Sequence, residues 1–282
     1  MNKVIFITGT STGFGRLMAH TFSQAGDTVV ATMREPQGRN AAVAKELAAL
    51  PNTEVQEVDV TNDESVQSAV QQTLSKHGRI DVLINNAGIY AVGIQEAFSI
   101  PQAHRIMNVN YYGVLRLYQA VLPAMRNAQD GLIINISSGY GLVSFPFVVP
   151  YCASKFALEA LTEGSHAELM TQGIENVLIE PGAYPTDLFG KTHYSDRPDV
   201  AEAYGQGVSD FMVVAAQSLE DAMARTGANP QRIADAALAL ASMEKGTRPL
   251  RTPLDMAADG VDAEYVQAKA DIKTKWLAKY GF

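Results

Sequence analysis

Short apolar runs rich in valine and isoleucine alternate with longer amphipathic segments along most of this chain. The runs lie at residues 4–7, 28–31, 54–58, 82–84, 132–136 and 176–179. Continuous β-branched runs of this length are typical of strands buried on both faces of a parallel sheet. The alternation predicts right-handed βαβ crossovers, and hence an α/β fold with a doubly wound, mostly parallel sheet of about seven strands and helices on both faces.

Helical spacing of apolar residues predicts where the other elements lie. Helices are expected at about residues 13–24, 61–76, 102–128, 151–171, 200–224, 230–243 and 262–280, with a short edge strand within 247–254. No internal repeat, low-complexity tract or Pro/Gly/Ser-rich linker divides the 282 residues. We therefore expect a single domain over residues 1–282, with a substrate-binding segment at about 187–225 and a C-terminal extension at about 246–282.

The composition narrows the classes of partner and compartment. With a net charge of −8 the chain repels phosphate backbones and anionic lipids, so we expect no nucleic-acid partner and no membrane. The single cysteine, Cys152, allows neither an intramolecular disulfide nor a pair of metal-binding thiols, and no metal site is expected. The apolar run near the N-terminus is too short for a signal peptide, and no run approaches the ~18 apolar residues of a membrane span. We therefore expect a cytoplasmic protein.

A glycine-rich turn follows the first predicted strand, at residues 8–15. Gly9, Gly13 and Gly15 allow a sharp turn and close approach to a pyrophosphate, and the helix that follows presents free N–H groups to it. The candidate cofactor contacts here are Gly9, Ser11, Thr12, Gly13, Phe14 and Gly15. An ordinary tight turn is the alternative. The spacing is GxxxGxG rather than GxGxxG, and with the preceding threonine it resembles the cofactor motif of the short-chain dehydrogenase/reductases, in their single-domain subgroup. That resemblance implies a Rossmann fold.

The end of the second predicted strand bears on which dinucleotide binds. Met33 occupies the position where NAD-dependent members of this family resemble one another in having aspartate, and Arg34 follows it. An arginine at this place suits the 2′-phosphate of NADP, and Arg39 could assist. Glu35 argues for NAD, but it lies one residue late, and Arg34 could instead be a solvated loop charge. We predict NADP(H) as the cofactor.

Tyr151 and Lys155 form a YxxxK pair on a predicted helix. Residues i and i+4 share one helix face, so the phenol and the ammonium face the same space. An unperturbed phenol has a pKa of about 10, and a nearby ammonium, together with an oxidised nicotinamide, favours the phenolate and lowers that value. Ser138 lies at the end of the fifth predicted strand, thirteen residues before Tyr151, where its hydroxyl could hold a substrate oxygen.

The resemblance implies a role for each residue of this group. Tyr151 is the general acid/base, Lys155 lowers its pKa and binds the nicotinamide ribose, and Ser138 orients the carbonyl. Asn110, in the pattern Asn-Val-Asn, matches a helix asparagine that supports a water leading to the lysine in similar enzymes.

Further family motifs add cofactor contacts by the same resemblance. They comprise Asp59 and Val60 at the adenine, Asn86, Ala87 and Gly88 of an NNAG motif, and Pro181, Gly182, Tyr184 and Thr186 of a PGxxxT motif at the nicotinamide amide. Asp59 could equally act as a helix cap. Two departures put the local nicotinamide geometry in doubt: Tyr184 is bulky, and Pro185 lacks an N–H.

Two apolar stretches, residues 140–149 and 187–224, are predicted to line a substrate pocket, with Leu142, Phe189, Ser138 and Tyr151 as candidate contacts. We predict a small hydrophobic ketone, aldehyde or alcohol as substrate, although this apolar surface could be core or dimer interface. His193 is the one histidine in a candidate substrate loop, and Cys152 is expected to pack away from the catalytic face.

Chain length and the Ala-Thr-Met-Arg strand end resemble bacterial members related to 17β-hydroxysteroid and retinol dehydrogenases. The resemblance also implies a homodimer or homotetramer paired through the two long helices at 102–128 and 151–171. Two other functions remain open: an NADP-binding sensor or regulatory protein without turnover, and a same-fold isomerase or dehydratase that uses the same tyrosine.

Overall fold

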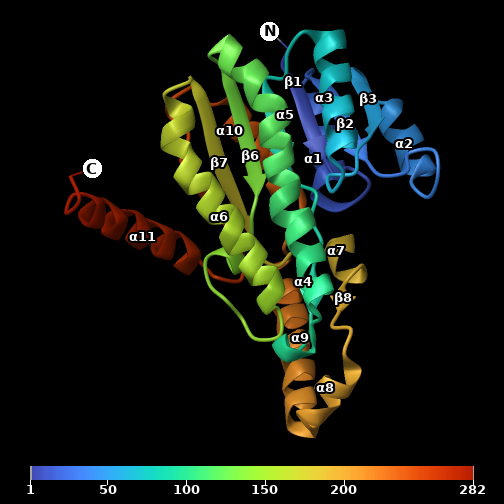
Figure 1. Ribbon diagram of the computed structural model, residues 1–282, viewed down its shortest axis with the longest axis vertical. Coiled ribbons are helices and arrows are strands. Elements are labelled where there is room, and N and C mark those ends of the chain that lie inside the picture. The colour runs from blue at the N-terminus through green and yellow to red at the C-terminus, as the bar shows by residue number, and fades with distance from the viewer. Residues whose placement is uncertain (1, 282) are drawn as a thin grey trace.

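The computed structural model describes residues 2–281 and is built around a sheet of seven parallel strands in the order β3-β2-β1-β4-β6-β7-β9 (Figure 1). Its strands are β1 (Val4–Thr8), β2 (Thr28–Met33), β3 (Thr53–Glu57), β4 (Val82–Asn85), β6 (Gly131–Ile136), β7 (Ile174–Pro181) and β9 (Arg251–Leu254). The strand order reverses between β1 and β4, which pair in parallel with Phe6 beside Leu83. This is the doubly wound Rossmann arrangement, as predicted.

Helices cover both faces of the sheet. They are α1 (Gly13–Gln24), α2 (Ala41–Ala48), α3 (Asp63–His77), α4 (Ile100–Met107), α5 (Gly113–Ala128), α6 (Val149–Met170), α7 (Asp187–Gly190), α8 (Pro198–Ala203), α9 (Gln206–Thr226), α10 (Gln231–Ser242) and α11 (Val261–Leu277). A π-helix lies at Asn108–Tyr112, and two 3-10 turns lie at Gln95–Ala97 and Gly139–Gly141.

Alternate residues of the buried strands point into two separate cores. Ile5 and Ile7 of β1 pack with apolar residues of α1, α2 and α10, whereas Phe6 packs with residues of α3, α5 and α6. Successive side chains of a strand point to opposite faces, so a continuous apolar run supplies both cores at once. The valine- and isoleucine-rich runs of the sequence have this physical origin.

One predicted helix is continuous in the structure and another is divided. The expected helix at residues 102–128 runs through α4, the π-helix and α5 without a break, because the π-helix is only a bulge within it. The expected helix at 200–224 consists of α8 and α9, which separate at Gly205, a residue with φ of 77°. Helix α2 was not predicted, and neither was the two-stranded pair β5 (Ala91–Val92) and β8 (His193–Tyr194).

After β7, α10 packs against α1 on one face of the sheet, and the other segments lie at the carboxyl end of the sheet and along its edge. Helices α8 and α9 extend below the body of the molecule, and α11 extends to one side (Figure 1). Between them, β9 forms the predicted edge strand and pairs in parallel with β7. Within residues 2–281, no helix combines the length and apolar character needed to cross a membrane.

Candidate active site

The carboxyl ends of the central strands open into a cavity of about 720 Å³. This is the position where doubly wound sheets bind ligands, beside the reversal of strand order between β1 and β4. Most of the predicted site residues line it: Gly9, Ser11, Thr12, Gly13, Phe14, Arg34, Asp59, Val60, Asn86, Ala87, Gly88, Ser138, Leu142, Tyr151, Lys155, Pro181, Gly182, Thr186 and Phe189. Gly15, Asn110 and Tyr184 do not line it among the described residues.

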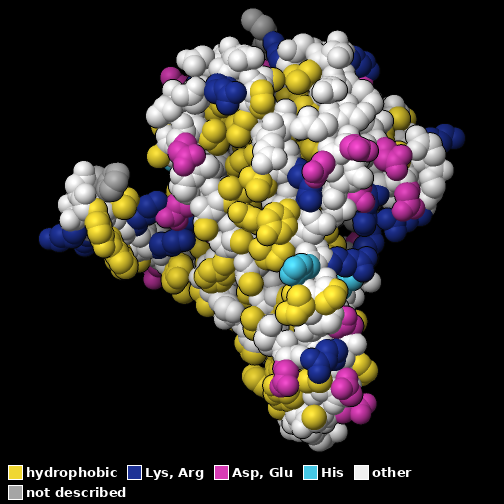
Figure 2. All heavy atoms as spheres, viewed as in Figure 1, with side chains coloured by type: hydrophobic (Ala, Val, Ile, Leu, Met, Phe, Trp, Pro, Cys, Tyr) yellow, Lys and Arg dark blue, Asp and Glu magenta, His cyan; other side chains and the backbone are white. Residues whose placement is uncertain are grey.

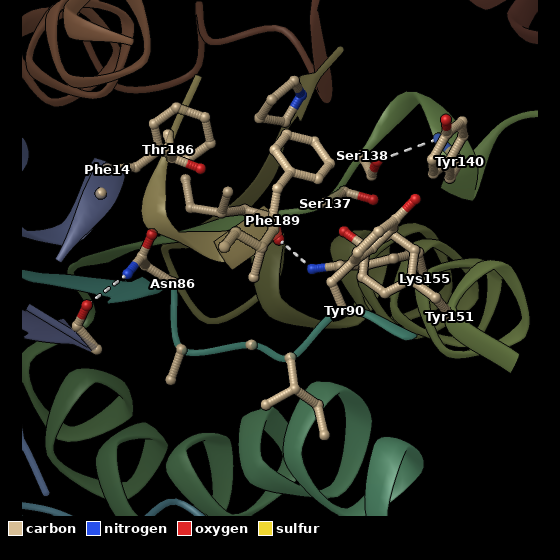
Figure 3. A pocket seen from close by; sticks show the side chains of 18 of the residues that line it. Phe14, Asn86, Tyr90, Ser137, Ser138, Tyr140, Tyr151, Lys155, Thr186 and Phe189 are labelled. Carbon is tan, nitrogen blue, oxygen red and sulfur yellow. Dashed lines mark hydrogen bonds between the residues drawn. The ribbon is translucent and has the colours of Figure 1, made fainter. Parts of the chain in front are cut away.

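The glycine-rich turn is held by close packing against the end of β4. Gly9 has a φ of 71°, and a Cβ on Gly15 would lie 2.4 Å from the carbonyl oxygen of Gly9. The side-chain amide of Asn86 donates to the carbonyl oxygens of Thr8 at 2.8 Å and Gly9 at 3.1 Å (Figure 3). Gly15 therefore allows close packing on the side of the turn that faces away from the cavity. The side that faces the cavity keeps room for a phosphate-bearing ligand.

Positive charge gathers at one end of the cavity. Arg34, Arg39 and Lys191 all line it, and the ammonium of Lys191 donates to the hydroxyl of Thr12 at 3.4 Å. Arg39 forms an ion pair with Glu35 at 3.2 Å, whereas within residues 2–281 no carboxylate lies within 4.0 Å of Arg34. The turn and these cations together fit the pyrophosphate and ribose phosphates of a dinucleotide. Sequence reasoning missed Lys191, which carries no motif.

The catalytic candidates meet at the other end of the cavity. Tyr151 and Lys155 come from the first turns of α6, and Ser138 comes from the end of β6. The Nζ of Lys155 donates to the carbonyl oxygen of Ile136 at 2.8 Å and lies 5.8 Å from the ring centre of Tyr151 (Figure 3). The predicted convergence of a phenol, an ammonium and a serine hydroxyl is therefore present.

Burial dominates the electrostatics of this group. It raises the pKa of the Tyr151 hydroxyl, and the nearby Ser138 hydroxyl only partly opposes this rise. Burial also lowers the pKa of Lys155 to about 8, although the charge of Glu159 acts in the opposite direction. In the structure by itself the pKa of Tyr151 is therefore raised, and the lowering expected from the Lys155 ammonium together with an oxidised nicotinamide stays a prediction.

Asn110 lies in the π-helix and is hydrogen-bonded to α6, the helix that carries Tyr151. Its Oδ1 accepts from the backbone N–H of Ile89 at 2.9 Å, and its Nδ2 donates to Ile89 O at 3.0 Å and to the Ser154 hydroxyl at 2.9 Å. Ser154 in turn donates to the backbone carbonyl of Tyr151 at 2.7 Å. The bulge turns Asn110 inward, so that it ties the loop after β4 to α6. Its role in a water relay stays a prediction.

Tyr184 does not fit the predicted cofactor contact. Its side chain is 1% exposed and lies in the core, with its ring edge against Phe14 at 5.7 Å between ring centres. Its hydroxyl donates to the carbonyl oxygen of Leu254 at 3.0 Å. The bulk of this residue is therefore used to anchor strand β9, and its assignment to the nicotinamide is corrected.

Two further tyrosines pack around Tyr151, and of these Tyr90 lies outside the segments predicted to line the pocket. The ring centre of Tyr90 lies 4.9 Å from that of Tyr151, and the ring centre of Tyr140 lies 6.2 Å from it (Figure 3). Cys152 is buried in the same cluster and does not line the cavity, in keeping with the packing role predicted for it. Tyr90 follows the NNAG motif by two residues, and this adjacency is the only signal that could have indicated it.

The walls of the substrate end come from both predicted segments, with Leu142, Val143 and Phe145 from residues 140–149, and also from the C-terminal extension. Of the segment at 187–225, the residues that line the cavity are Leu188, Phe189, Lys191, His193 and Leu219. Phe211, Val213 and Val214 of α9 are exposed instead. The C-terminal extension supplies a further wall, including Asp255 and Tyr265, whose hydroxyl donates to Leu142 O at 3.3 Å. Within residues 2–281, no three or more His, Cys, Asp or Glu side chains gather in a way that could hold a metal ion.

Comparison with known proteins shows the family to which this chain belongs. A model of the short chain dehydrogenase family matches residues 3–196. A 3-ketodihydrosphingosine reductase from Bacteroides thetaiotaomicron is 36% identical over 233 residues, which cover 82% of this chain and 80% of that protein. A short-chain dehydrogenase structure from Streptomyces avermitilis has a TM-score of 0.76 at 31% identity, covering 100% of this chain and 97% of its own.

A second solved structure is the 3-ketoacyl-(acyl-carrier-protein) reductase from Brucella melitensis in complex with NADH. It has a TM-score of 0.73 at 26% identity and covers 90% of this chain and 96% of its own. The chain therefore belongs to the short-chain dehydrogenase/reductase family, and the resemblance seen in its sequence is confirmed. It is an oxidoreductase with a site for a nicotinamide cofactor.

Proposed function

We propose that this protein uses NADP(H) to interconvert a hydrophobic ketone or aldehyde and its alcohol, with Tyr151 as general acid/base. One observation carries the proposal: the hydroxyls of Tyr151 and Ser138 and the ammonium of Lys155 meet at one end of a cavity whose other end is the glycine-rich turn. A bound nicotinamide would supply the hydride, and the protein positions and polarises the carbonyl.

Ser138 and Tyr151 act on the substrate oxygen in different ways, and Lys155 acts through Tyr151. The Ser138 hydroxyl donates a hydrogen bond to the carbonyl oxygen, and the Tyr151 hydroxyl transfers its proton to that oxygen as charge develops there. Burial raises the pKa of Tyr151, which keeps the phenol protonated at neutral pH. This is the form that reduction requires. The Lys155 ammonium stabilises the phenolate left behind, from 5.8 Å away from the ring centre.

The charged residues of the adenine-ribose end support NADP rather than NAD. The position after Thr32 is the buried, uncharged Met33, so it places no carboxylate beside the ribose 2′-oxygen. Arg34 is free to meet a 2′-phosphate, whereas Glu35, the residue that favoured NAD, is paired with Arg39.

The substrate end is mainly apolar, which supports a hydrophobic substrate. Its walls include Leu142, Val143, Phe145, Leu188 and Phe189. One relative of this chain is named for the reduction of 3-ketodihydrosphingosine. That keto compound therefore belongs in a substrate panel beside smaller cyclic and aromatic ketones.

Consumption of NADPH with this panel, followed at its absorbance band, tests the proposal. We expect turnover that prefers NADPH, falls by about 10²–10⁴-fold in Tyr151→Phe, and persists in Tyr280→Phe, a control at an exposed residue that follows α11. NADPH binding without turnover of any ketone would favour a sensor. Conversion of substrate without cofactor consumption would favour an isomerase or dehydratase.

A further inference from the structure

A group of buried charged side chains connects the C-terminal extension to the catalytic helix. Arg251 of β9 is almost fully buried, with its Nε 3.0 Å from Glu159 Oε2 on α6 and 3.2 Å from Glu180 Oε1 on β7. Its guanidinium also donates to Glu163, one turn further along α6. Three carboxyl groups therefore surround one guanidinium in the interior.

Glu159 is the member of this group that reaches the catalytic residues. It lies one helical turn after Lys155, on the same face of α6. Its Oε1 accepts a hydrogen bond from the Ser137 hydroxyl at 2.6 Å, and Ser137 immediately precedes Ser138. A Cβ on Gly141 would lie 2.9 Å from Ser137 Oγ, 3.1 Å from Glu159 Cγ and 3.3 Å from Lys155 Cβ, which shows how closely the three side chains gather.

The other carboxyl groups are neutral or paired elsewhere. Burial, reinforced by the charge of Glu159, raises the pKa of Glu180 to about 9, so that Glu180 keeps its proton at neutral pH. Glu163 shares its charge with Lys269 and Lys273 of α11 as well as with Arg251. Glu159 is therefore the carboxyl group that contacts the Arg251 guanidinium and also lies one helical turn from Lys155.

We propose that Glu159 is a positioning residue that keeps Lys155 in its ammonium form, and that Arg251 holds the Glu159 carboxylate in place for this task. Ordinarily a lysine buried to this degree loses its proton readily, and a nearby anion opposes that loss. The edge strand β9 would then influence the charge of Lys155 through Glu159, although Arg251 itself does not line the cavity. The inference rests on the proposed function only in giving Lys155 a catalytic role.

Direct titration of Lys155 tests, without any substrate, whether Glu159 stabilises the Lys155 ammonium. Lysine labelled with ¹³C at Cε reports each pKa by NMR, and Lys155→Arg identifies the signal. We expect a pKa of about 8 in the native protein. Glu159→Gln should lower it by roughly one unit, because the neighbouring anion is removed. Arg251→Met should lower it in the same direction, because the carboxyl at 159 then shares its buried site with Glu180 without a cation and takes up a proton.

Glu180→Gln is the matched control, since it also replaces a buried carboxyl of this group but resembles the protonated form that Glu180 already has. It should leave the Lys155 pKa unchanged, and Arg251→Lys should restore most of the value lost in Arg251→Met. An unchanged pKa in Glu159→Gln, or an equal fall in Glu180→Gln, would overturn the inference even if Arg251→Met failed to fold.

The pH profile of NADPH turnover then connects the titration to catalysis. In Glu159→Gln the alkaline limb of kcat should move to lower pH by the same roughly one unit, since the ammonium is lost earlier. If the NMR shifts are found but no NADPH turnover is, the proposed function is disproved, whereas the effect of Glu159 on the Lys155 ammonium is supported. Turnover with an unmoved alkaline limb would disprove the role of Glu159 in catalysis.

Discussion

Arg34 is the side chain on which the choice of cofactor depends. It lines the cavity at the end of β2 without a carboxylate partner within 4.0 Å among residues 2–281, so its charge is available to a phosphate. Replacement by alanine removes a charge-assisted contact with the 2′-phosphate. We expect Arg34→Ala to lower kcat/KM for NADPH by about 10–100-fold with little change for NADH.

Initial rates with both cofactors measure this effect, and Arg39→Ala is the comparison because Glu35 already pairs with Arg39. We expect a smaller loss of kcat/KM for NADPH in Arg39→Ala than in Arg34→Ala. An equal fall for NADH and NADPH in Arg34→Ala would instead mean that Arg34 has a structural role.

Glu180 should make the stability of the protein depend on pH. Its carboxyl is fully buried, and burial raises its pKa from 4.5 to about 9. Between these values the unfolded chain has lost the proton that the folded chain keeps, so this residue's contribution to the free energy of unfolding falls as pH rises from about 4.5 to 9. Glu180→Gln removes the ionisable group.

Thermal unfolding at a series of pH values checks this sign. The melting temperature of Glu180→Gln relative to the native protein should increase from pH 5 to pH 8, reaching a gain of at least about 2 °C. A gain that is the same at both pH values would show that Glu180 ionises normally in the folded state.

At the scale of elements, α11 is joined to the body through few contacts. Its lysines Lys269 and Lys273 pair with Glu163 on α6, while Ile272 and Trp276 of the helix, and Tyr280 just after it, are exposed. Although burial acts the other way, hydrogen bonds from Lys273 and Arg251 hold the pKa of Glu163 at about 2. The stabilisation from this carboxylate is present above pH 4.5, its unfolded value, and is lost as pH falls toward 2.

Glu163→Gln should therefore loosen α11 without unfolding the sheet. We expect amide exchange in residues 261–277 to rise by about 3–10-fold while exchange in β1 and β6 is unchanged. Asp271→Asn, on the same helix but facing Gln267, is the control. Equal exchange in the two variants would mean that α11 is held by other contacts, such as that of Tyr265 with Leu142.

At the scale of the whole molecule, the surface over α5 and α6 is the expected site of self-association. Figure 2 shows a band of apolar side chains over these two helices, and Tyr112, Phe156 and Met170 are exposed on or beside them. Paired long helices imply a homodimer or homotetramer by resemblance to the family, and an exposed apolar patch of this kind is typical of an interface.

Phe156→Glu should place a charge in that interface and shift the protein to monomers. Sedimentation velocity at micromolar concentration measures the change, with Val213→Glu on α9 as a control of equal charge. Native protein that sediments as a monomer would disprove the proposed association outright.

The parts of the fold and site that could be predicted are those that depend on residues close together in the sequence. The valine- and isoleucine-rich runs became buried parallel strands because alternate side chains fill two cores. The glycine-rich turn lies beside its own strand, and Tyr151 and Lys155 share a face because they are one helical turn apart. Local geometry is enough for each of these features, so the sequence by itself determined the doubly wound sheet, the cofactor turn and the tyrosine–lysine pair.

Only the tertiary structure decided how distant segments complete the site. Tyr184 became a core anchor for β9, Tyr265 reached the cavity wall from the C-terminal extension, and Arg251 met Glu159 across 92 residues of sequence. Burial also raises the pKa of Tyr151, and the nearby Ser138 hydroxyl opposes this rise only in part. Contacts and desolvation of this kind depend on how elements pack in three dimensions, and no spacing along the chain encodes them.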